Sequence, residues 1–111
     1  MDPEDAKIIA LARASRVRAK AAEGACVRDL DGRTYAASTV ALPSLSLSAI
    51  QVAVAMAVSS GSEGLEAVAV VTDAVSLVGS DLAAVHDLAG AGVLVLRCDH
   101  AGGVVDRVTT S

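Results

Sequence analysis

The chain has 111 residues, which suffice for one domain around one core, so we expect residues 1–111 to fold as a single domain. Apolar residues make up 53% of the sequence, but Tyr35 is the only aromatic residue, so alanine and valine must fill most of the core. The formal net charge of −4 and the scattered basic residues argue against nucleic-acid binding, which needs clustered Lys and Arg and usually stacking aromatic rings.

Residues 3–24 have the apolar spacing of an amphipathic helix, with Pro3 near its start, acidic residues in its first turn and Gly24 near its end. Four basic residues gather on this helix: Arg13, Arg16, Arg18 and Lys20. Because acidic residues flank them, we interpret them as a solvated helix face, with weak RNA contact as the alternative.

Two strands are predicted next, over residues 25–30 and 33–38. They flank Asp31-Gly32, whose ready access to positive φ suits a two-residue turn, so we expect an antiparallel hairpin. A loop containing Pro43 follows the second strand.

The middle of the chain, residues 34–62, contains no charged residue. Within it, the segment from Ser46 or Ser48 to Ser59 is apolar on nearly every side and predicts a buried helix that Gly61 ends. Only residues 49–58 are densely apolar, well short of the roughly 18 to 20 residues of a membrane span. We therefore expect no membrane segment.

Short, continuous apolar runs at 67–71 and 93–98 predict strands that are buried on both faces. A helix over 81–88 separates them, and Gly102-Gly103 turns the chain into a last strand at 104–109. Strand–helix–strand crossovers are right-handed by strong preference, so the two buried strands should run parallel beside the hairpin. The order predicts an α/β fold.

Cysteine usage bears on the compartment. Cys26 and Cys98 are too few for a disulfide framework, and no basic segment followed by an apolar stretch opens the chain. We expect a cytoplasmic protein with reduced thiols.

Several local strings carry a family resemblance. They are Gly24-Ala25, Asp31-Gly32-Arg33-Thr34-Tyr35, Ala57-Val58-Ser59-Ser60-Gly61 and residues 67–73. In these strings and in its order of elements the chain resembles the small, homotetrameric, bacterial-type cytidine deaminases, which are zinc hydrolases. The resemblance implies a three-layer α-β-α fold with a mixed five-stranded sheet, an antiparallel hairpin beside parallel strands. It also implies a homo-oligomer, with a tetramer favoured over a dimer.

The chain departs from that family at its motifs. The family's Cys-Ala-Glu-Arg falls on residues 48–51, its Pro-Cys-Gly-x-Cys-Arg-Gln on 77–83, and its ribose-contacting Asn-Val-Glu on 39–41. Ser48, Val78 and Asp81 thus stand at the zinc ligands, and Ile50 at the catalytic glutamate. Thr39 and Ala41 replace two ribose contacts.

These substitutions change what the positions can do. Zinc sites use thiolate, imidazole or carboxylate ligands, whereas Ser48 offers a neutral hydroxyl, Val78 offers no lone pair and only Asp81 could ligate. Ile50 cannot relay a proton. We therefore expect no zinc, no other cofactor and no catalytic residue.

A residual pocket is still expected where the starts of two helices converge. Its candidate lining residues are Thr39, Ala41, Ser48, Gly79, Ser80 and Asp81. We interpret Ser48 and Ser80 as helix caps, and Asp81 as a first-turn carboxylate whose negative charge interacts favourably with the helix dipole.

Cys98-Asp99-His100 is a local cluster of possible metal ligands that only Cys26, His86 or Asp106 could complete. We interpret it as a buried thiol beside two turn residues, and His86 as a surface or interface residue. Asp31 is likewise interpreted as a turn residue.

The small-residue surface of the central helix consists of Ala49, Val52, Ala53, Met56 and Ala57. It is predicted to form core, and the resemblance adds a subunit interface.

We therefore predict a catalytically inactive, cytidine deaminase-like protein, a pseudoenzyme, with a structural, regulatory or binding role and an unidentified protein partner as one option. The first alternative is a nucleoside deaminase-type hydrolase with a non-standard site, for which Ser48, Asp81, Cys98 and His100 are the candidates. Nucleoside binding without turnover, and a subunit that partners an active deaminase, are the others.

Overall fold

The computed structural model describes all residues, 1–111. The helices are α1 (Pro3–Ala19), α2 (Ala49–Ser59) and α3 (Gly79–Ala89). The strands are β1 (Gly24–Asp29), β2 (Thr34–Ser38), β3 (Val40–Leu42), β4 (Leu45–Leu47), β5 (Leu65–Val71), β6 (Leu94–Cys98) and β7 (Val104–Thr109). None of the helices combines the length and the hydrophobicity that crossing a membrane would require.

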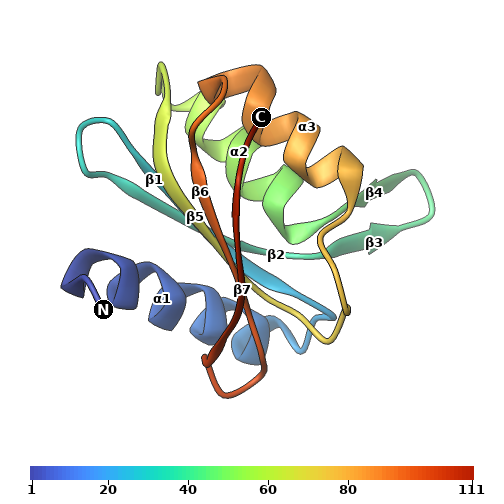
Figure 1. Ribbon diagram of the computed structural model, residues 1–111. Helices are drawn as coiled ribbons and strands as arrows, with labels where there is room; N and C mark the ends of the chain where they lie inside the picture. Colours follow the sequence, from blue (N-terminus) through green and yellow to red (C-terminus); the bar gives the residue numbers. More distant parts are fainter.

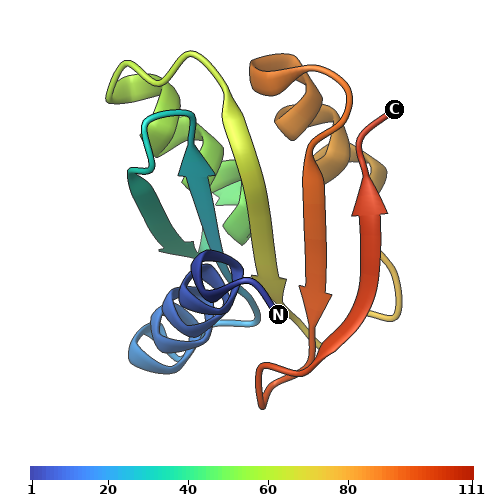
Figure 2. The same cartoon turned by 60° about the vertical axis from the view of Figure 1, so that its left-hand side comes forward.

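The main sheet has five strands in the order β2-β1-β5-β6-β7 (Figures 1 and 2). Strands β5 and β6 are parallel, and every other neighbouring pair is antiparallel. This confirms the predicted mixed sheet and the parallel pair beside the hairpin.

Helices cover the sheet on both faces, with α1 on one side and α2 and α3 on the other (Figure 1). The α1-side core includes Ile8, Cys26 and Leu96, while the core under α2 and α3 includes Ile50 and Val85. The predicted three-layer α-β-α architecture is therefore confirmed.

Gly24 lets α1 approach the sheet closely. A Cβ atom at this position would overlap the carbonyl oxygen of Ala12, so no other residue fits without moving the helix. The helix itself ends at Ala19, and Lys20 takes a left-handed conformation with φ 51°.

The predicted loop containing Pro43 is confined to the turn Pro43-Ser44, because the residues on either side form a second, two-stranded sheet of β3 and β4 that was not predicted. Val40 pairs with Leu47, and Leu42 pairs with Leu45 across Pro43-Ser44. Proline fits a turn because its ring presets φ, so Pro43 can occupy the turn of this hairpin without interrupting either strand.

The predicted two-residue turn at Asp31-Gly32 is wrong. The amide of Asp29 donates to the carbonyl of Arg33 at 2.8 Å, and the amide of Gly32 donates to the carbonyl of Asp29 at 3.1 Å. Only Gly32 has a positive φ, of 83°. The connection is therefore a three-residue loop, in which a turn is followed by a glycine bulge.

Candidate functional site

Ser48 begins α2 as its N-cap. Its hydroxyl oxygen accepts a hydrogen bond from the Gln51 amide at 3.1 Å, and the Gln51 side-chain oxygen accepts from the Ser48 amide at 3.0 Å. This reciprocal pair is a capping box, which satisfies two amides at the helix start. The predicted cap at Ser48 is confirmed.

Asp81 connects the start of α3 to the start of α2. It lies in the first turn of α3, as predicted, and is only 4% exposed. The Ser48 hydroxyl donates to Asp81 Oδ1 at 2.5 Å, the short distance of a charge-assisted bond. The sequence predicted that these two positions converge, but not that they bond directly.

The other motif positions are apolar or open. Ile50 is fully buried in the core beneath α2. Val78 is the N-cap of α3 and makes no side-chain capping bond. The predicted cap at Ser80 is wrong, because α3 begins earlier, at Gly79, and leaves Ser80 exposed inside the first turn.

Thr39 and Ala41 lie in different environments. Thr39 Oγ1 accepts from the Glu23 amide at 3.0 Å and lies 3.4 Å from the Glu23 carbonyl oxygen, to which it donates. Thr39 thereby ties the end of β2 to the segment before β1. Ala41 is exposed on β3.

Cys98 and His100 lie apart from Ser48 and Asp81. The Cys98 thiol belongs to the α1-side core, on the opposite face of the sheet from α2 and α3. His100 is exposed in the turn after β6, where its carbonyl oxygen accepts from Arg13 Nε at 3.1 Å. One chain therefore does not assemble these four residues into a single site.

Both cysteines are unpaired and buried. Burial raises the pKa of Cys26 to about 11, and burial together with the charge of Asp99 raises the pKa of Cys98 to about 11. The interpretation of Cys98 as a buried thiol beside turn residues is confirmed.

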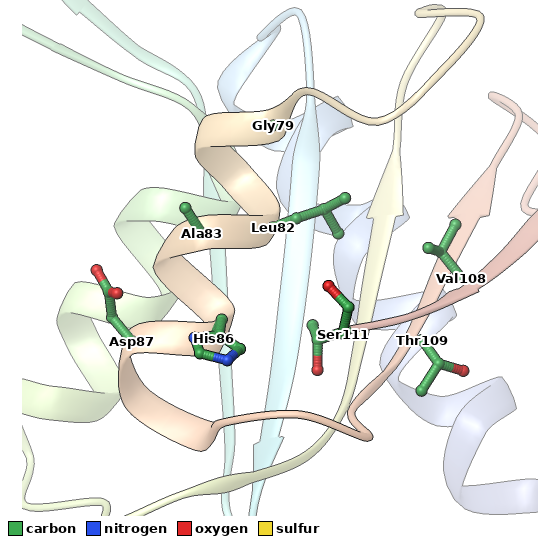
Figure 3. Close-up of a pocket in the computed structure, with 9 residues that line it drawn as sticks. Gly79, Leu82, Ala83, His86, Asp87, Val108, Thr109 and Ser111 are labelled. Carbon is green, nitrogen blue, oxygen red and sulfur yellow. The ribbon is translucent and has the colours of Figure 1, made fainter.

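A surface hollow of about 530 Å³ lies between α3 and the end of β7 (Figure 3). Leu82 points from α3 toward this hollow, and the exposed His86 stands at its rim and belongs to no group of three or more potential metal ligands. Of the six candidate pocket residues, only Gly79 lines this hollow, and none lines the other three hollows of the surface. No pattern in the sequence predicted this hollow, because it depends on how α3 packs beside β7.

Comparison with known families decides the relationship. A family model described as cytidine deaminase-like matches residues 1–102. The chain belongs to the cytidine deaminase-like family. A comparison with curated proteins gives no match.

Solved structures agree with this assignment of the fold. The chain is similar to cytidine deaminase from Burkholderia pseudomallei, with a TM-score of 0.82, 21% identity, and 94% of this chain and 91% of that chain covered. For cytidine deaminase from Mycobacterium leprae the TM-score is 0.75 at 19% identity, with the same coverage. For that from Mycobacterium tuberculosis it is 0.69 at 22% identity, with 80% of each chain covered.

The side chains that the family resemblance would place around a zinc ion do not fit one. Among Ser48, Val78 and Asp81 there is one carboxylate, one hydroxyl already bonded to that carboxylate, and one hydrocarbon. Zinc sites in proteins are built from at least three nitrogen, sulfur or carboxylate ligands. Nowhere does this cytidine deaminase-like chain bring three or more His, Cys, Asp or Glu side chains together in a metal-binding group.

Proposed function

We propose that this chain is a catalytically inactive member of the cytidine deaminase-like family, a pseudoenzyme with a structural, regulatory or binding role. The observation that carries the proposal is the direct bond between Ser48 and Asp81. It uses the hydroxyl proton and one carboxylate oxygen at the convergence of α2 and α3, where hydrolytic chemistry would need a free ligand set.

The chemistry of deamination supports the same proposal. Attack of water on a cytosine ring needs a water whose pKa is lowered from about 15.7 to about 7, and a group that relays its proton. The fully buried hydrocarbon side chain of Ile50 stands at the position that the resemblance assigns to the proton-relaying glutamate. Asp81 already accepts a hydrogen bond from Ser48.

Metal content and turnover test this proposal together. The purified protein is dialysed against zinc and then against buffer, bound zinc is measured by mass spectrometry, and release of ammonia from cytidine is followed. We expect less than 0.1 zinc per chain, on the order of a trace for a chain without three ligands, and no ammonia above a no-protein blank. Stoichiometric zinc with ammonia release would refute the proposal, and zinc lost in Asp81→Ala but kept in Asp87→Ala would locate it.

We also propose that the chain is a homo-oligomer. The charge-free residues 34–62 form β2, β3, β4 and α2, and on them Leu42 is 59% exposed, Leu45 49% and Met56 39%. Large apolar side chains exposed along a segment without charged residues favour a protein interface. A second copy suits it because the contact buries no charge on either side.

The small-residue surface predicted on α2 divides in two. Ala49, Ala53 and Ala57 are fully buried within the chain, whereas Met56 faces outward beside a hollow of about 410 Å³ that Val52 and Tyr35 also line. The outward half is the part available to a second copy.

We propose the cytoplasm as the compartment, in keeping with two buried, unpaired thiols.

A further inference from the structure

Asp81 is a buried carboxylate with no cationic partner. Each ion pair of the molecule involves one of Arg16, Arg28, Arg33 and Arg97, and none includes Asp81. A buried charge without compensation is strongly destabilising, so something else must stabilise this one. Its surroundings supply the Ser48 hydroxyl and the starts of two helices.

Both helix starts lack another anion. The first turn of α2 has no acidic residue, and the N-cap of α3, Val78, makes no side-chain capping bond. The free amides at a helix N-terminus carry partial positive charge, which favours a nearby carboxylate. Asp81 therefore serves as the anion for two helices at once.

Ser48 is shared in the same way. Its oxygen accepts from the Gln51 amide of α2 while its proton goes to Asp81 of α3. One hydroxyl thus completes the cap of one helix and the hydrogen bonding of a carboxylate from the other. Loss of Ser48 leaves the Gln51 amide of α2 and the Asp81 carboxylate of α3 without this partner, and loss of Asp81 leaves the Ser48 hydroxyl without its acceptor.

We propose that the Ser48–Asp81 pair is a metal-free clamp that joins the starts of α2 and α3 and fixes their packing on the sheet. It rests on the proposed function only in taking these positions to be free of metal. The clamp connects α2 and α3 at the point where the resemblance would place a zinc ion. The hydrogen bond therefore links the two helices of this layer without a metal ion.

A double-mutant cycle tests the clamp. Ser48→Ala, Asp81→Ala and the double variant are unfolded in urea with EDTA present. We expect Asp81→Ala to lower the folding equilibrium constant roughly tenfold to a hundredfold, the range for a charged hydrogen bond. The double variant should be more stable than the product of the single effects predicts, by at least about fivefold. The exposed Asp87→Ala on the same helix is the control, expected within about twofold of the parent.

A swap keeps the test decisive if Asp81→Ala does not fold. Aspartate caps a helix about as well as serine, so Ser48→Asp by itself should be harmless unless Asp81 is its neighbour. We expect Ser48→Asp to be destabilised by two facing carboxylates, and the swapped pair Ser48→Asp with Asp81→Ser to recover most of the loss. Additive single effects, or a swap no more stable than Ser48→Asp, would overturn the clamp.

The two proposals fail separately. Stoichiometric zinc with cytidine turnover refutes the pseudoenzyme, whatever the cycle gives. Independent effects of Ser48→Ala and Asp81→Ala in zinc-free protein refute the clamp alone.

Discussion

Asp29 and Asp99 hold the two long hairpin turns of the main sheet in the same way. Oδ1 of Asp29 accepts from the amides two and four residues later at 3.0 and 2.9 Å, and Oδ1 of Asp99 does the same at 3.0 and 2.9 Å. Three residues after each aspartate stands a glycine with positive φ, Gly32 at 83° and Gly102 at 86°. Asp29 accepts a further bond from the Ser62 hydroxyl at 2.7 Å.

Acid should therefore weaken the protein through Asp29. The Ser62 hydroxyl bond, followed by amide bonds from Arg33 and Asp31 and the charge of Arg33, lowers the pKa of this carboxyl. Because the folded pKa lies below the unfolded value of about 3.9, the stabilisation is complete above that pH and is lost as pH falls through the folded pKa.

The urea midpoint measured from pH 6 to pH 2 checks this. We expect Ser62→Ala to be less stable than the parent at pH 6 and to lose less further stability in acid. Ser44→Ala, exposed in the β3–β4 turn, is the control. Parallel curves for Ser62→Ala and the parent would contradict the assignment.

The two thiols should not react with thiol reagents in the folded protein. With the pKa of Cys26 and of Cys98 raised to about 11, both are protonated at pH 8, and neither is exposed. A maleimide should label no cysteine at pH 8 in buffer and two in denaturant, as counted by intact-mass spectrometry. Rapid labelling in buffer would show that the core opens locally.

Alkali should act on the same thiols with the opposite sign to acid. A folded pKa above the unfolded value of about 8.5 means that stability begins to fall above that pH and continues to fall up to about 11. Cys26→Ala should flatten this limb of the urea midpoint, at the cost of a small cavity. An unchanged slope would assign the alkaline loss to other groups.

Thiolates introduced at the clamp should convert it into a metal site. The side chains of Ser48 and Asp81 meet, and Val78 immediately precedes α3, so Ser48→Cys, Val78→Cys and Asp81→Cys together supply three zinc ligands. We expect about one zinc per chain and a raised melting temperature that EDTA reverses. A triple variant with Val75→Cys in place of Val78→Cys is the control, and equal zinc in both would show that the three positions do not converge.

Charge on the proposed interface should separate the copies. Met56→Asp or Leu45→Asp places a carboxylate on the charge-free surface and should shift sedimentation toward a smaller species, because a charge buried at a contact costs several kcal/mol, on the order of 2 to 5. Val75→Asp, at a side chain that is 89% exposed outside this surface, should leave the sedimentation coefficient unchanged. Equal behaviour of all three variants would place the contact elsewhere.

Local signals in the sequence predicted most of the elements. The start of α2 was predicted at Ser46 or Ser48 and lies at Ser48, and β7 was predicted with its observed ends, because capping and residue patterns act over a few residues. The β3–β4 hairpin was missed because its strands have three residues each, too few for a period to be recognised.

The sequence by itself determined the α/β order of helices and strands, since that order follows from residue type and local spacing, and the family resemblance implied the mixed five-stranded sheet. Only the tertiary structure decided that Ser48 bonds to Asp81, that Asp29 and not Asp31 organises its turn, and which side of α2 remains outside. Those outcomes depend on how helices rotate and approach one another across the sheet. Packing of distant segments sets that geometry, and no short stretch of sequence encodes it.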